Sequence, residues 1–147
     1  MYKHILIPTD GSEVAEKAVA QGIEFAREAK ARVTLFTAVP EYEPPSEAQV
    51  FARRVVSIAD HARESEEAAM RILAHPSDLA RAAGLQFDTD YEQSNQPWQA
   101  IVNAAKRHGC DAIFMASHGR KGLSRLVHGS QTVDVLTHSD IPTLVVR

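Results

Sequence analysis

Two short apolar runs constrain this chain more than any other feature. His4 to Pro8 reads His-Ile-Leu-Ile-Pro, and Ala112 to Ala116 reads Ala-Ile-Phe-Met-Ala, with almost no polar residue between the apolar ones. A strand without polar alternation is buried on both faces, as in a sheet that helices cover on either side. The two runs therefore predict two central strands of an α/β fold.

Helical patterns and further strands lie between these runs. Ser12 is placed to cap a helix. The apolar face of that helix recurs at steps of three and four: Ala15, Val19, Gly22, Ile23 and Ala26. A second strand is expected from Val33 to Val39, with Pro40 as its stop.

The middle of the chain predicts a long helix. Glu41 to Ser46 carries two prolines and is expected to be an exposed loop. After it, apolar residues at helical spacing predict a stripe that faces the core: Phe51, Val55, Ile58, Ala62, Ala69 and Ile72. Pro76 is expected to bend or end this helix, because it lacks an N–H and clashes with the preceding turn. Ser77 then caps a last short piece that ends before Gly84.

The remaining elements complete an alternating pattern. Leu85 to Tyr91 alternates apolar and polar residues, which predicts an edge strand. A helix begins at Pro97 and ends at Gly109, and a short helix near 131–137 precedes the strand Thr143 to Val146. Five strands that alternate with helices predict one α/β domain over residues 1–147, a five-stranded parallel sheet in the order 3-2-1-4-5 with helices on both faces.

This strand order also predicts where a ligand binds. The winding direction reverses between strands one and four, and open α/β sheets bind ligands beyond the carboxyl ends of the strands at such a switch point. The loops Pro8 to Gly11 and Ala116 to Gly122 meet there. Any ligand is therefore expected between these two loops.

Composition excludes several classes of partner. The formal net charge is -3 with both signs mixed, which does not suit a nucleic-acid-binding face. No apolar stretch approaches the roughly 18 residues that a membrane span needs, and the chain enters its first strand without a signal peptide. Cys110 is the single cysteine, which fits a reducing compartment. We expect a cytoplasmic protein with no membrane partner.

Glycines after the fourth strand suggest a phosphate site. Gly119, Gly122 and Gly129 can bring backbone N–H groups close to an anion, and Gly129-Ser130 precedes the last helix, whose N-terminus carries partial positive charge. Arg120 and two further basic residues add positive charge. Each glycine, taken alone, is equally explained as a turn or cap residue.

Four stretches together resemble the universal stress protein family. They span the chain in order: His4 to Ser12, Ala116 to Arg120, Gly129-Ser130, and Ile141 to Val146. The ATP-binding branch of that family carries Gly, two residues, Gly, nine residues, then Gly and Ser or Thr. Gly119 and Gly129-Ser130 fit this pattern, whereas Ala116 stands in place of the first glycine.

The resemblance implies ATP, with Mg, as the ligand. Pro8, Thr9 and Asp10 then line the pocket, with Asp10 near the ribose or a metal. Val39 contacts the adenine. The phosphates are held by Gly119, Gly129 and Ser130, near Ala116, Arg120, Gln131 and Thr132. From the residues alone, Asp10 is a turn residue and Val39 a core residue.

The resemblance further implies a dimeric stress-response protein that binds ATP. No nucleophile–base pair or arginine finger is evident beside the glycine loop, so we expect it to hydrolyse ATP slowly or not at all. The two subunits pair through the strand Thr143 to Val146. Two alternatives stay open: a family member that has lost ATP, for which Ala116 is the sign, and a slow ATPase or adenylyl-transferring enzyme of the same sheet class.

Overall fold

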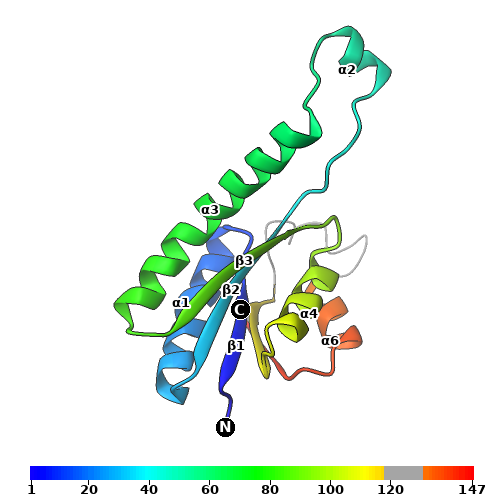
Figure 1. Ribbon diagram of the computed structural model, residues 1–147. Coiled ribbons are helices and arrows are strands. Elements are labelled where there is room, and N and C mark those ends of the chain that lie inside the picture. Colours follow the sequence, from blue (N-terminus) through cyan, green and yellow to red (C-terminus); the bar gives the residue numbers. More distant parts are fainter. Residues whose placement is uncertain (118–130) are drawn as a thin grey trace.

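The fold is a single parallel sheet in the order β3-β2-β1-β4-β5, as the sequence predicts. The computed structural model describes residues 1–117 and 131–147. Its strands are β1 (His4–Pro8), β2 (Arg32–Val39), β3 (Phe87–Gln93), β4 (Ala112–Ala116) and β5 (Thr143–Val146). All four neighbouring pairs are parallel, so the carboxyl ends of all strands share one edge (Figure 1).

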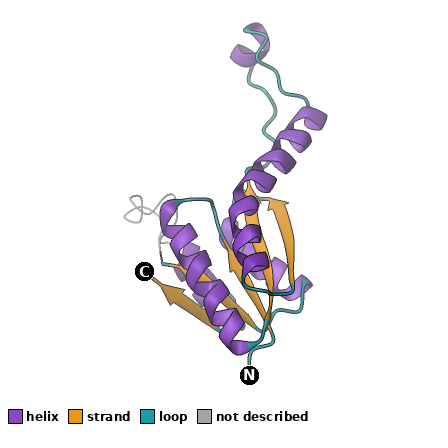
Figure 2. Ribbon diagram, turned by 90° about the vertical axis from the view of Figure 1, so that its left-hand side faces the viewer, coloured by secondary structure: helices purple, strands orange, loops and turns teal. Residues whose placement is uncertain are grey.

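Helices cover both faces of this sheet (Figures 1 and 2). The helices are α1 (Glu13–Ala29), α2 (Glu47–Phe51), α3 (Ile58–Ala82), α4 (Pro97–Arg107) and α6 (Gln131–His138), and all but α2 pack on the sheet. α1 and α3 lie on one face, while α4 and α6 lie on the other and contact each other. Within the described ranges, no helix has both the length and the apolar character that crossing a membrane requires.

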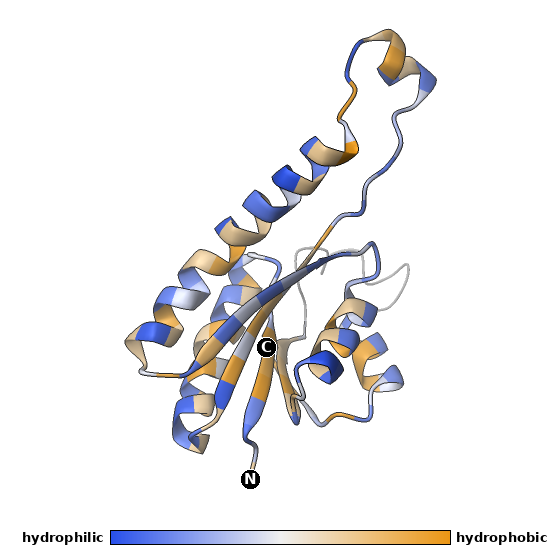
Figure 3. Cartoon of the chain, in the orientation of Figure 1, coloured by the Kyte–Doolittle hydropathy of each residue, from blue (hydrophilic) through white to orange (hydrophobic). Residues whose placement is uncertain are grey.

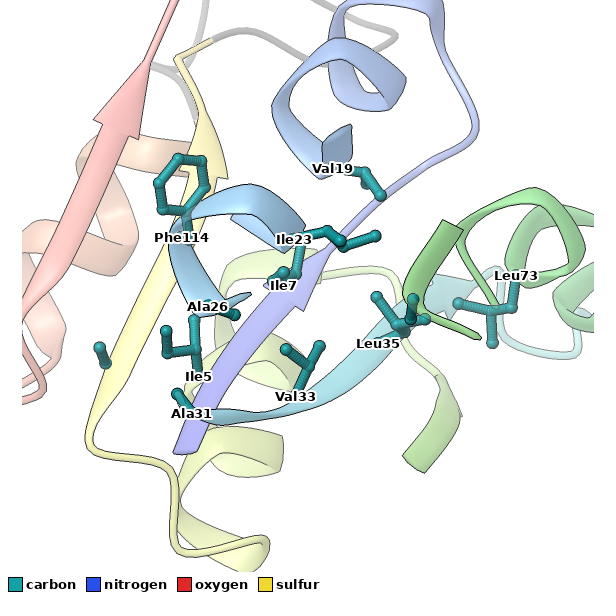
Figure 4. Close-up of a cluster of buried hydrophobic side chains, with 12 residues drawn as sticks. Ile5, Ile7, Val19, Ile23, Ala26, Ala31, Val33, Leu35, Leu73 and Phe114 are labelled. Carbon is teal, nitrogen blue, oxygen red and sulfur yellow. The ribbon is translucent and has the colours of Figure 1, made fainter. Parts of the chain in front are cut away.

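The core on the α1 side is built from alternate residues of the central strands (Figure 4). Ile5 and Ile7 of β1 and Val33 and Leu35 of β2 point to this face and are fully buried. Leu6 and its neighbours on the opposite faces of the strands meet α4 and α6 instead. The apolar runs are therefore buried on both sides, as their lack of polar alternation predicts.

The N-terminal end of α1 is set by a side-chain cap. The Ser12 hydroxyl accepts a hydrogen bond from the Ala15 N–H at 3.2 Å, as the sequence predicts. The apolar face of α1 is buried throughout, and Gly22 faces Ile7 and Phe114 of the sheet. A Cβ built on Gly22 would be 2.9 Å from Ile7 Cδ1 and 2.9 Å from Phe114 Cδ1, so only glycine permits this approach.

The sequence predicts that Pro76 bends or ends α3, and the helix does not end there. α3 runs from Ile58 to Ala82 as one helix with Pro76 inside it. Leu73 and Ala80, on either side of Pro76, are both buried on the sheet. Packing of both halves therefore outweighs the roughly 3 kcal/mol that an internal proline costs. Gly84 follows the end of this helix with φ 72°, as predicted.

The core-facing stripe from Phe51 to Ile72 is also wrong in its first half. Phe51 is 92% exposed and Ile58 is 69% exposed, and the helix buries residues only from Ser65 onward. Residues 41–64, which we call the arm, project beyond the sheet (Figures 1 and 2). The 25 residues of α3 span about 37 Å, whereas the eight-residue β2 spans about 26 Å, so α3 extends beyond the sheet.

The third strand is an edge strand as predicted, but it begins two residues later. β3 starts at Phe87, which pairs with Val33. Leu85 belongs to the end of α3, because its N–H donates to the Ala80 carbonyl at 3.1 Å beside the left-handed Gly84. The helix cap thus takes the residues that the alternation alone assigned to the strand.

Candidate functional site

The loop after β1 begins at the carboxyl edge of the sheet and is held by Thr9. Thr9 is buried, and its N–H extends the β1–β2 ladder by donating to the Phe36 carbonyl at 2.8 Å. Its hydroxyl accepts from the Gly11 N–H at 3.1 Å and lies 3.5 Å from Glu16 Oε1. One side chain therefore joins the strand end, the turn and the first helix.

Asp10 shapes the turn that leads into α1. Asp10 Oδ1 accepts from the Ser12 N–H at 2.9 Å, which closes a local side-chain turn. Gly11 follows with φ 78°, a conformation that favours glycine. Pro8 ends β1 and is buried, whereas Asp10 is half-buried at the surface of the loop. The turn role that the residues alone suggest for Asp10 is present in the structure.

The end of β4 is joined to the start of α6. The Thr132 hydroxyl donates to the Ala116 carbonyl at 2.8 Å and lies 3.3 Å from the Ser117 carbonyl. Thr132 is buried at 6% exposure in the first turn of α6. This contact places the N-terminus of α6 at the carboxyl end of β4, next to the loop after β1, because β1 and β4 are neighbours.

Two other predicted residues flank this point. Gln131, the first residue of α6, is exposed, and its Oε1 accepts from the Trp98 N–H of α4 at 2.8 Å. Val39, the last residue of β2, is 3% exposed, and its carbonyl accepts from the Ser94 N–H at 2.7 Å. The structure thus brings Pro8, Thr9, Asp10, Ala116, Gln131 and Thr132 to one edge, with Val39 one strand further along. Gly119, Arg120, Gly129 and Ser130 lie outside the described residues.

Ser117 is a polar residue at this edge that the sequence does not predict as a ligand contact. Its Oγ is buried, and it makes no hydrogen bond to the parts of the chain that the structure describes. A buried hydroxyl without a protein partner is rare in folded proteins, and it can donate to a bound water or ligand. The sequence signal that could have identified Ser117 is its position directly after an apolar strand. The small Ala116 and the donor-capable Ser117 together fit an anionic ligand that needs space and hydrogen bonds.

Glu16 is a second residue that sequence reasoning missed. It lies on α1 beneath α3, and its Oε2 is buried 3.9 Å from His75 Nε2, beyond hydrogen-bonding distance. Burial raises the pKa of Glu16, while the nearby His75 and the Thr9 hydroxyl oppose that rise. The sequence signal that could have identified Glu16 is its position at the border of the apolar face of α1, one residue after Ala15. A shallow surface pocket beside it is lined by Gly11, Glu16, Arg71, Ile72 and His75.

No metal centre is built into the described residues. Across 1–117 and 131–147, no three His, Cys, Asp or Glu side chains gather as metal ligands. Cys110 is buried, and burial raises the pKa of its thiol to about 11, so it is a core residue without thiolate character at neutral pH. The carboxyl edge thus offers small residues, hydroxyl groups and a helix N-terminus.

These features define an open α/β protein with a candidate ligand site at its topological switch point. The sequence profile of the Universal stress protein family matches residues 1–147. The chain therefore belongs to the universal stress protein family.

Known proteins of the family are similar along their whole length. Universal stress protein YxiE of Bacillus subtilis is 26% identical over 152 residues, which cover all of both chains. The solved structure of protein MJ0577, from Methanocaldococcus jannaschii, has a TM-score of 0.75 and 27% identity, and the match covers 99% of this chain and 96% of that one. A universal stress protein crystallised with cAMP has a TM-score of 0.75 at 23% identity, over 99% and 97% of the two chains, which establishes a common fold.

Proposed function

We propose that this protein binds ATP at the carboxyl edge of the sheet, between the loop after β1 and the N-terminus of α6, and acts as a dimeric regulatory protein of the stress response. The observation that carries the proposal is the hydrogen bond from Thr132 to the Ala116 carbonyl. It fixes a helix N-terminus at the switch point, where backbone N–H groups and the helix dipole favour phosphate.

The residues around this point suit a nucleotide. The buried Ser117 hydroxyl lacks a partner within the described chain and is a donor for a phosphate or ribose oxygen. The motif Gly119, Gly129 and Ser130 supplies further small residues in the family pattern. That an adenine nucleotide occupies a protein of this fold is known from the cAMP complex.

Mg fits the site as a companion of the phosphates and not as a resident metal. Mg binds through one or two carboxylates together with phosphate oxygens and water. Asp10 is the carboxylate that the loop after β1 offers, and it stands half-buried beside Gly11. Bound there, Mg would neutralise phosphate charge while Asp10 orients it. We do not propose fast ATP hydrolysis, which needs a dedicated nucleophile and base.

The first test is direct. Freshly purified protein is denatured, and any released nucleotide is identified by chromatography. The refolded or nucleotide-free protein is then titrated calorimetrically with Mg-ATP, and with cAMP and AMP for comparison. We expect Mg-ATP to bind most tightly. A protein that releases no nucleotide and shows no heat with any of the three would overturn the proposal.

Variants locate the site. Gly129→Val is expected to abolish Mg-ATP binding while leaving the circular dichroism spectrum unchanged, because a side chain would occupy the space of the phosphates. Ser130→Ala is expected to weaken binding by about 1.5–3 kcal/mol, the value of one hydrogen bond to a charged group. Ala116→Gly tests whether alanine at the first glycine position of the motif weakens binding. Tighter binding of Mg-ATP would show that the Ala116 Cβ crowds the ligand. Unchanged affinity in Gly129→Val would place the phosphates elsewhere.

A further inference from the structure

The arm carries the largest group of exposed apolar side chains in the described chain. Val50, Phe51, Val55, Val56 and Ile58 are 54%, 92%, 51%, 42% and 69% exposed. Figure 3 shows hydrophobic residues at the tip of the arm, far from the sheet. Five such residues within nine positions exceed the scattered apolar exposure of an ordinary surface, so they indicate an interaction surface.

Side-chain contacts at the base of the arm hold it in one orientation, and this orientation sets the direction in which the exposed apolar side chains point. The Tyr42 hydroxyl donates to the Val56 carbonyl at 3.1 Å, and its ring meets the His61 ring at 5.5 Å. His61 Nε2 lies 3.1 Å from the Pro40 carbonyl. The segment that enters the arm therefore contacts the first turns of α3. A capping box at Ser46 and Gln49 orders α2 at the tip. The exposed side chains are therefore presented on an ordered segment.

The surface continues along α3 as a row of residues at steps of four. This row consists of Ile58, Ala62, Glu66 and Met70, all of them exposed. Residues four apart form one ridge on a helix, and the small Ala62 lets a second helix approach closely. The row runs beside Ser65 and Ala69, which are buried on the body of the protein. One flank of α3 is thus packed, and the mainly apolar row, which Glu66 interrupts, has no covering element in the described chain.

Charge selects the occupant of this flank. Arg53 and Arg54 at the tip take part in no ion pair within the described residues, and neither does Glu66, the one charged residue of the row. Two arms that lie antiparallel about a two-fold axis near Ile58 and Ala62 bring each tip against the partner's Glu66. In such an isologous contact every complementary pair forms twice.

We propose that a second copy of this chain docks on the arm, with the two arms antiparallel and the exposed row of α3 at their interface. A bilayer surface suits the arm less well. Glu66 interrupts the apolar row, and two arginines fall short of the basic clusters that bind anionic lipid. The arm continues from β2 into α3, which packs on β2 and β3, so the contact is separate from pairing through β5 at the other end of the sheet (Figure 1).

Disulfide trapping tests the geometry. Ala62→Cys lies near the proposed two-fold axis, and Glu64→Cys is its control: it is also exposed on the same helix, but about 200° around the helix axis at 3.6 residues per turn. Both are made in the full chain, where the native Cys110 is buried with a pKa of about 11 and stays a thiol. Under mild oxidation we expect a covalent dimer for Ala62→Cys and little for Glu64→Cys. Equal yields, or no dimer from Ala62→Cys, would overturn the proposal.

Charge reversal tests the pairing. Association is measured by sedimentation in chains that carry Val145→Pro, which removes an outward N–H of β5 and isolates the arm contact. We expect Arg53→Glu with Arg54→Glu, or Glu66→Arg alone, to raise the Kd about tenfold, since symmetry counts each contact twice. All three changes together are expected to restore it. Failure of the combination to restore association would contradict the antiparallel register.

A vesicle control separates the competing occupant. Wild-type chain is sedimented with vesicles of phosphatidylserine and phosphatidylcholine, beside Phe51→Ser. We expect both to stay in the supernatant. Binding of the wild type that Phe51→Ser abolishes would assign the arm to a membrane and would overturn the second-copy proposal.

Discussion

Individual polar atoms mark the candidate site of this protein more sharply than its apolar residues do. Thr9 bonds the turn after β1, and Thr132 bonds the end of β4 to α6. Ser117 and Glu16 each carry a buried oxygen that finds no hydrogen-bond partner in the described chain. Such atoms lower the free energy of unfolding unless water or a ligand satisfies them, so they belong to sites that a fold maintains for another purpose.

Glu16 gives a pH-dependent prediction. Its pKa is raised in the folded protein, chiefly by burial, so its charged form is disfavoured there. Stability from this group is fully present below the unfolded carboxyl pKa and is lost as pH rises through the folded pKa. Glu16→Gln is therefore expected to be more stable than the wild type at pH 7 and nearly equal to it at pH 4. Urea unfolding at both pH values measures this.

The control for that measurement is Glu13→Gln on the same helix. The Glu13 side chain is 87% exposed, and within the described residues its ion pair is with Lys17 at 3.8 Å. Removing its charge should change stability little at either pH. A wild type that is more stable than Glu16→Gln at pH 7 would show that the carboxylate of Glu16 is satisfied by a bound group.

At the scale of elements, the close approach of α1 to the sheet is the main constraint on packing. Gly22 lets α1 contact β1 and β4, and α1 in turn positions the loop that carries Thr9 and Asp10. Phe114 cannot easily yield, because its ring packs 5.6 Å from the ring of Phe25. The helix and the two central strands therefore form one rigid unit beneath the candidate site.

Gly22→Ala tests this unit. Alanine favours a helix over glycine by about 1 kcal/mol, but here its Cβ would lie 2.9 Å from Ile7 and Phe114. Overpacking of a core costs about 1–3 kcal/mol, so we expect a lower midpoint of denaturation. Gln21→Ala, an exposed position on the same helix, is the control and should not lower it. A Gly22→Ala variant more stable than wild type would mean that α1 can move away from the sheet.

For the whole molecule, the outer edge of β5 is the proposed site of pairing with a second copy. The Pro142 carbonyl accepts from Ile113 of β4 and the Val146 carbonyl accepts from Ser117, just after β4, so the main-chain groups of Thr143 and Val145 point outward. In the described residues no strand covers this edge. Exposed Val133 and Leu136 of α6 lie nearby in the chain, at 54% and 52% exposure. An uncovered apolar edge of this kind favours pairing with a second copy.

Val145→Pro is expected to weaken pairing through β5. Proline removes the outward N–H of Val145 and leaves the β4 ladder intact, which edge strands tolerate. Light scattering should show a lower mass than for Val145→Thr, the control that keeps the N–H. An unchanged mass in both variants would count against β5 as the interface.

The sequence alone determined the sheet, its order and the turn chemistry, because those follow from local patterns. The apolar runs at His4 to Pro8 and Ala112 to Ala116 can only be central strands, and Ser12 caps α1 as its side-chain chemistry requires. It also placed the residues after β1 and β4 together, since parallel neighbours share an edge. Membership of the universal stress protein family follows from the same motifs.

The tertiary structure decided what depends on the relative dimensions of the parts. The apolar stripe of α3 shows which side of the helix packs, but not that the helix outruns the sheet and leaves Ile58 exposed. Pro76 stays inside α3 because residues on both sides of it pack on the sheet, a contact that no local pattern records. Glu16 is half-buried because α3 packs against α1. Coverage by distant segments, and not local preference, sets the environment of each of these residues.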